Sequence, residues 1–180
     1  IKVIAGNIRG LKLDSDKNEK LRPTKDRVKE SLFNILNFNI LRKSFLDLFG
    51  GTGQIGIEAF SRGAENVVII EHSKENAKLI KKNIAKIKQP HNIKFFQTDA
   101  INYIQNCKNK FDIIYIDPPY QEINILEKSL ILSEKIINKN GFIITETLSS
   151  YVSTEKINNI TLQKRYIYGN ISLNLYKNIQ

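Results

Sequence analysis

Residues 117–120, Asp-Pro-Pro-Tyr, are the stretch of this sequence whose side chains are best suited to chemistry. They directly follow an isoleucine-rich run, 111–116, which is typical of a strand buried on both faces of a parallel sheet. Proline cannot donate to a sheet ladder, so the two prolines should end the strand and begin a stiff loop. In open α/β sheets, ligands bind at this carboxyl edge of the strands.

The loop carries the groups needed to hold an exocyclic amino group of a nucleobase. The Asp117 carboxylate and the Pro118 carbonyl can accept its two N–H bonds, while Tyr120 can stack on the ring. The alternative is a capped strand end with a Pro-Pro turn, and Asp-Pro-Pro alone does not decide between the two. The tyrosine in the next position and a glycine-rich turn upstream favour the functional interpretation.

That turn, Gly51-x-Gly53-x-x-Gly56, follows a predicted strand and opens a predicted helix. Its glycines let backbone N–H groups approach a ligand, and the helix N-terminus favours an anionic group. The anion could be a pyrophosphate or the carboxylate of an amino-acid-like cofactor. Asp47, just before the turn, suits a cationic amine and would be poorly placed beside a pyrophosphate.

Two further acids follow predicted strands. Glu71 lies about twenty residues beyond the turn, where an acid accepts hydrogen bonds from ribose hydroxyls, and this position fits either cofactor. Asp99 could accept from an adenine amine. It could equally be the N-cap of the helix that follows.

Composition limits the kind of protein this can be. The 180 residues are enough for one domain with a small extension, and 28 Lys and Arg against 18 Asp and Glu give a net charge of +10. This excess favours a polyanionic partner such as nucleic acid, although abundant Lys, Ile and Asn could also reflect biased genomic base composition. A single cysteine, Cys107, excludes an internal disulfide and a cysteine-based metal site. We expect no metal and no membrane span.

The order of elements predicts a mostly parallel sheet with helices on both faces. Segments 160–168 and 171–176, joined by the tight turn Gly169-Asn170, place an antiparallel strand at the sheet edge and bring the expected number of strands to seven. The other strands are expected at 44–49, 67–71, 93–97, 111–117 and 142–147, and the helices between them at 54–61, 74–88, 99–106 and 123–137, the last ended by Asn140-Gly141.

The N-terminal region differs from this alternation. Two short apolar pieces, 2–5 and 10–13, predict a small β-hairpin that carries Arg9 and Lys12. A helix then begins with Thr24 as its expected N-cap. Its apolar stripe is expected to contain Val28, Leu32, Ile35 and Leu36.

Together these motifs resemble those of class I S-adenosylmethionine-dependent methyltransferases acting on exocyclic amines. More narrowly, the sequence resembles the RsmD family of bacterial 16S rRNA guanine-N2 methyltransferases, nearly end to end. Gly50-Gly51-Thr52 departs slightly from that family, in which Ala and Ser are expected in many members. The motifs that carry the resemblance are Ile4-Ala5-Gly6…Arg9-Gly10, Leu21-Arg22-Pro23-Thr24-x-x-Arg27-Val28-x-Glu30-x-Leu32-Phe33-Asn34 and Leu46-Asp47-Leu48-Phe49…Glu58-Ala59-x-Ser61-Arg62-Gly63.

The resemblance implies a Rossmann-like methyltransferase domain at 21–180 and an RNA-contacting N-terminal hairpin at 1–20. It implies methyl transfer from S-adenosylmethionine to the 2-amino group of a guanine in 16S rRNA, free or in an assembling small subunit, by a cytoplasmic monomer. The expected catalytic residues are Asp117, Pro118 and Tyr120; the expected cofactor-binding residues are Arg22, Thr24, Asp47, Phe49, Gly51, Gly53, Glu71, His72, Asp99 and Ala100; and the expected RNA-binding residues are Arg9, Lys12, Arg27 and Pro119.

Three other functions remain open from the sequence. Adenine-N6 methylation of DNA would use the same residues 117–120, but the chain is short for a large sequence-reading domain. A nicotinamide-dependent oxidoreductase would use the glycine turn and leave 117–120 without a role. A basic RNA-binding module without activity would bind through Arg9, Arg22 and Arg27.

Overall fold

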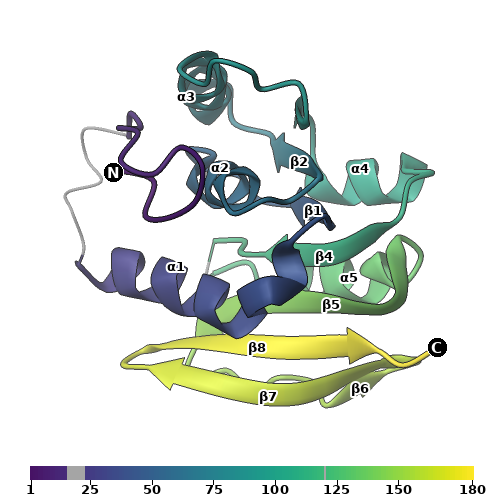
Figure 1. The fold of residues 1–180 in the computed structure, drawn as a ribbon. Helices are drawn as coiled ribbons and strands as arrows, with labels where there is room; N and C mark the ends of the chain where they lie inside the picture. The colour runs from purple at the N-terminus through teal and green to yellow at the C-terminus, as the bar shows by residue number, and fades with distance from the viewer. Residues whose placement is uncertain (16–22, 120) are drawn as a thin grey trace.

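The computed structural model describes residues 1–15, 23–119 and 121–180 and contains strands alternating with helices along most of the chain (Figure 1). The strands are β1 Ser44–Asp47, β2 Asn66–Glu71, β3 Ile93–Gln97, β4 Phe111–Ile116, β5 Ile137–Leu148, β6 Lys156–Ile157, β7 Ile160–Tyr168 and β8 Ile171–Asn178. The helices are α1 Pro23–Leu36, the 3-10 turn η1 Asn37–Ile40, α2 Gln54–Ser61, α3 Lys74–Ala85, α4 Ala100–Asn106 and α5 Ile123–Ser133.

Within the described residues the strands form one sheet, in the order β3-β2-β1-β4-β5-β8-β7-β6. The first five strands pair in parallel, and β8 is antiparallel to both β5 and β7. The mostly parallel sheet and the antiparallel C-terminal hairpin are therefore confirmed. The sheet has eight strands where seven were expected, because the two-residue β6 adds an edge strand beside β7.

Helices cover both faces of the sheet, and two hydrophobic cores result. Figure 1 shows α1 and α2 in front of the sheet and α4 and α5 behind it. The front core contains Leu32 of α1 and Ile57 of α2, whereas the rear core contains Ile104 of α4 and Leu126 of α5. Among the described helices, none combines the length and the apolar content that a membrane span requires.

Strand β4 is buried on both sides, as the isoleucine-rich run predicts. Ile113 and Tyr115 belong to the front core, and Ile114 and Ile116 belong to the rear core. This alternation follows from the two-residue period of a strand. Because β4 lies between β1 and β5, its carboxyl end is at the centre of the sheet edge.

The prediction for α5 and β5 is wrong in its boundaries. Helix α5 ends at Ser133, and β5 already begins at Ile137, so Asn140-Gly141 lies within the strand. The pairing of β4 with β5 shifts register between Phe111 and Ile113, because β5 has extra residues between their partners. Asn140 is one of these extra residues and adopts a positive φ of 59°. An Asn-Gly pair therefore forms a bulge in the strand here and does not end the helix.

Helix α1 also begins earlier than expected. It starts at Pro23, which places Thr24 inside the first turn, so the predicted N-cap is wrong. Proline suits the first helical position because its fixed φ is helical and its missing N–H has no intrahelical partner there. The predicted apolar stripe is confirmed, since Val28, Leu32 and Leu36 are buried.

The N-terminal segment is a loop closed by a single antiparallel bridge between Lys2 and Lys12, where two paired strands were expected. It is attached to α2. The buried Glu58 carboxylate accepts the N–H bonds of Ile4 and Ala5 at 2.8 and 3.0 Å, and the carbonyl of Ser61 accepts from Asn7 at 2.7 Å. Side chains of the loop, including Val3, complete the front core.

Two glycines of this loop permit a direct test of its docking on α2. Gly6 and Gly10 have nearly the same positive φ, 88° and 86°, but a Cβ at Gly6 would overlap the Ser61 carbonyl, whereas nothing lies within 4 Å of one at Gly10. We expect Gly10→Ala to cost about 1 kcal/mol of unfolding free energy from backbone strain alone. Gly6→Ala should cost about 2–4 kcal/mol, because steric overlap adds to the strain. Urea unfolding measures the free energy of unfolding of both variants. Equal losses in the two variants would contradict the close packing of this loop on α2.

Candidate active site

A cavity of about 460 Å³ lies at the carboxyl edge of the parallel strands. The glycine turn after β1 contributes Phe49, Gly51 and Thr52 to its wall, and the loop after β4 contributes Asp117 and Pro118. These segments are more than sixty residues apart in the sequence. The structure thus confirms that the two loops singled out in the sequence meet at one site.

The glycine turn is held in shape by Glu71 at the end of β2. This carboxylate is buried, and its two oxygens accept the N–H bonds of Gly51 at 2.9 Å and Ser73 at 2.7 Å. Gly53, at φ 80°, leads directly into α2. A carboxylate offers about four acceptor positions. Glu71 can therefore hold the glycine turn and the start of α3 and still accept hydrogen bonds from hydroxyl groups of a ligand in the cavity.

Asp47 lies beneath the turn and is outside the cavity wall. It is 1% exposed, its Oδ2 accepts the N–H of Gly56 at 3.1 Å, and its Oδ1 has no hydrogen-bond partner in the described part of the chain. Burial raises the pKa of Asp47 from 3.8 to about 7, and the negative charge of Glu71 raises it further, while the hydrogen bond from the Gly56 N–H lowers it. A buried carboxylate oxygen without a partner is suited to a cationic ligand group nearby.

A smaller cavity of about 130 Å³ adjoins the first one, and Phe49, Glu71 and His72 line both. Asp99 and Ala100 lie in its wall. Asp99 also accepts the N–H of Asn102 at 2.9 Å, so it caps α4 as one of the two predictions states. The two connected cavities together suit an elongated ligand that runs from the glycine turn to the start of α4.

Several predicted site residues lie elsewhere. Arg9 and Lys12 are exposed on the N-terminal loop and Arg27 is exposed on α1, and none of the three lines a cavity identified in the described residues. Arg22 and Tyr120 lie outside the described residues, as does the side chain of Thr24. No group of three His, Cys, Asp or Glu side chains that could hold a metal occurs within the described ranges.

Two residues that line the larger cavity, Glu146 of β5 and Tyr115 of β4, are not among those predicted from the sequence. The Tyr115 hydroxyl donates to Glu146 Oε2 at 2.6 Å, and burial, followed by the charges of Glu146 and Asp117, raises the Tyr115 pKa well above its ordinary value. Glu146 could have been found, because it is the single charged residue in the otherwise apolar and Thr-containing segment 142–147.

Comparison with known proteins gives the family. The family model described as Conserved hypothetical protein 95 matches residues 1–177. The chain belongs to this family. Curated relatives of this chain include Ribosomal RNA small subunit methyltransferase D of Buchnera aphidicola, which is 35% identical over 98% of this chain and 92% of that protein. The protein of the same name from Escherichia coli is 33% identical over 98% of this chain and 89% of that protein.

Solved structures agree with this family assignment. A methyltransferase from Escherichia coli superposes with a TM-score of 0.88 and 30% identity, over 99% of this chain and 97% of its own. A methylase from Haemophilus influenzae superposes with a TM-score of 0.82 and is 31% identical in sequence. This member of Conserved hypothetical protein 95 is therefore an S-adenosylmethionine-dependent methyltransferase with a class I fold.

The buried Asp47 predicts an unusual pH dependence of stability. Because its pKa is about 7 when folded and 3.8 ordinarily, the folded state binds the proton more tightly, and stability falls as pH rises through this interval. In the cofactor-free protein the loss should approach about 4 kcal/mol by pH 8. Asp47→Asn keeps an oxygen for the Gly56 N–H and should remove most of the decline. Urea unfolding at pH 5 and pH 8 should show about 2.6 kcal/mol of this decline, because part of it is already complete at pH 5. A decline of the same size in the variant would assign it to another group.

Proposed function

We propose that this methyltransferase transfers a methyl group from S-adenosylmethionine to the 2-amino group of a guanine in small-subunit rRNA. The observation that carries the proposal is the meeting of the glycine turn with Asp117 and Pro118 in one cavity. The names of its curated relatives, at 33–35% identity over nearly their whole length, support small-subunit rRNA as the substrate. A net charge of +10 suits this polyanion.

The residues present fit S-adenosylmethionine. The buried Asp47 carboxylate beneath the glycine turn would provide a counter-charge for the nearby amino group of its methionine part, and the turn offers backbone N–H groups for the carboxylate. Glu71 would accept from the ribose hydroxyls, and the smaller cavity beside Asp99 and Ala100 would receive the adenine. The full set proposed to hold the cofactor, residues outside the described ranges included, is Arg22, Thr24, Asp47, Phe49, Gly51, Gly53, Glu71, His72, Asp99 and Ala100.

When bound, S-adenosylmethionine supplies a methyl group on a positively charged sulfur, which keeps the electron pair of the broken carbon–sulfur bond. The 2-amino lone pair of guanine is delocalised into the ring and is a weak nucleophile. Asp117 and the Pro118 carbonyl would accept hydrogen bonds from the two N–H groups and stabilise the positive charge that develops as nitrogen bonds to the methyl carbon. One proton then leaves the nitrogen through Asp117 to solvent. Alignment of the reacting atoms contributes the remaining acceleration.

The RNA would contact the enzyme on the face that carries the N-terminal loop and α1. Arg9 and Lys12 on the loop and Arg27 on α1 are exposed and positively charged, and they would bind phosphates. Pro119 is exposed beside the cavity, where the target nucleotide must enter after leaving its stack. We propose that Tyr120 stacks on that base, and that the enzyme acts as a cytoplasmic monomer on free or assembling subunit RNA.

The product identifies the function. Small ribosomal subunits that lack the modification, and duplex DNA, are each incubated with the enzyme and isotope-labelled S-adenosylmethionine, then digested to nucleosides for mass spectrometry. We expect the label in N2-methylguanosine from the subunit rRNA. Label in N6-methyladenine from the DNA would contradict the proposal.

Asp117 is expected to act on the chemical step. Asp117→Ala should remove about 2–4 kcal/mol of transition-state stabilisation, because the developing charge loses its carboxylate. That corresponds to a kcat lower by roughly 30- to 1,000-fold. Cofactor affinity, measured by calorimetry with S-adenosylhomocysteine, should stay within a few-fold, since the glycine turn and Glu71 are untouched. Full activity in the variant would rule out this role for Asp117.

A further inference from the structure

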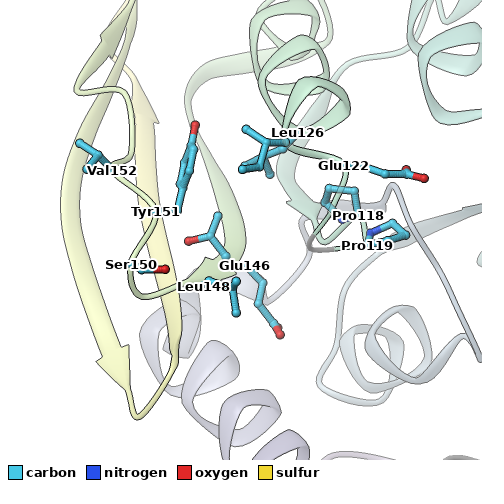
Figure 2. Close-up of a pocket in the computed structure, with 11 residues that line it drawn as sticks. Pro118, Pro119, Glu122, Leu126, Glu146, Leu148, Ser150, Tyr151 and Val152 are labelled. Carbon is cyan, nitrogen blue, oxygen red and sulfur yellow. The ribbon is translucent and has the colours of Figure 1, made fainter.

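A second pocket of about 300 Å³ lies beside the proposed methyl-transfer site and is used by nothing described so far. Its walls come from the loop after β4, from α5 and from the segment that follows β5. Figure 2 shows Pro118 and Pro119, Leu126 of α5, and Leu148 and Tyr151 around this pocket. A pocket of mainly apolar side chains with a few polar groups is typical of a small-molecule or nucleobase site.

Hydrogen bonds at Ser149 and Tyr151 hold the wall that is made by the segment after β5. The Tyr151 hydroxyl donates to Glu127 of α5 at 3.0 Å. The Arg165 guanidinium on β7 donates to the carbonyls of Ser149 and Tyr151 at 3.1 and 3.0 Å, and its Nε donates to the buried Asn174 of β8 at 3.1 Å. The pocket is therefore formed before any ligand binds, which limits the entropy lost on binding.

Glu146 lies at the junction of this pocket with the cofactor cavity. Together with Pro118 and Pro119 it lines both. It follows Thr145, the β5 partner of Ile116 in β4, so it is adjacent to Asp117 at the neighbouring strand end. Glu146 is 8% exposed, and the hydrogen bond from the Tyr115 hydroxyl fixes the position of its Oε2 atom.

Two neighbouring carboxylates match the hydrogen-bonding edge of guanine. Guanine presents N1–H and the 2-amino group side by side, which makes a continuous row of donors. Adenine presents an unprotonated N1 beside its 6-amino group, and that lone pair would face a carboxylate. If Asp117 accepts from the amino group, an acid in the position of Glu146 meets N1–H in guanine and is repelled in adenine.

We propose that the pocket of Figure 2 holds the ring of the target guanine and that Glu146 accepts its N1–H bond, so that Glu146 selects guanine over adenine. This inference rests on the proposed function, because it takes the 2-amino group as the methyl acceptor. The apolar walls bury the ring, and the shared residues direct its amino edge into the cofactor cavity. Glu146 is thus a specificity-determining residue, and Tyr115 is the residue that positions it.

The base analogue 2-aminopurine separates selection from chemistry. It keeps the 2-amino group, but its N1 is unprotonated and can only accept a hydrogen bond. Subunit RNA carrying either guanine or 2-aminopurine at the methylated position is assayed with the wild-type enzyme and with Glu146→Gln. The wild type should prefer guanine in kcat/KM by at least about 100-fold. The variant should lower this preference by about 10- to 100-fold, because its amide can donate to the unprotonated N1.

The preference is a ratio measured on one enzyme sample, so partial unfolding of Glu146→Gln cancels. Glu155→Gln is the matched control: it removes an exposed carboxylate just before β6, outside both pockets, and should leave the preference unchanged. If the wild type forms N2-methylguanosine and both variants keep its preference, the role of Glu146 is overturned and the proposed function stands. If the wild type methylates adenine, both are overturned.

Discussion

The parallel pairing of β4 with β1 and β5 is the constraint on which the site depends. Asp47 of β1 is level with Tyr115 of β4, and Ile116 of β4 is level with Thr145 of β5. Because parallel strands end at the same edge, this register brings together the glycine turn, the loop that begins at Asp117, and Glu146. A shift of one residue would turn alternate side chains to the opposite face of the sheet and separate these groups.

Much of the fold could be predicted from local pattern. The isoleucine-rich strand 111–116 is recognisable because burial on both faces requires a continuous apolar run, and the end of α2 is marked by Gly63 at φ 95°. The start of β5 could not be predicted in this way. Whether Asn140 and Gly141 end a helix or bulge a strand depends on the pairing of Ile137 with Phe111, which is distant in the sequence.

The candidate site shows the same division between local and non-local information. Asp117 and Glu71 could be predicted because they immediately follow or end recognisable strands, where side chains reach the ligand edge. Asp47 was expected to face a ligand directly, yet it lies under the turn and outside the cavity wall. The second pocket could not be predicted, because its wall depends on Arg165 and Tyr151 hydrogen bonds between separate elements.

The attachment of the N-terminal loop has a kinetic consequence. Its contacts join residues far apart in the chain: the Ile4 N–H meets Glu58 after 54 residues, and the Asp14 N–H meets Asn83 after 69. Closing such long loops costs chain entropy before any contact forms, so the N-terminal loop should reach its final place late in folding. The surface proposed to bind RNA would then form only after α2 and α3 have packed on the sheet, so partly folded molecules would lack it.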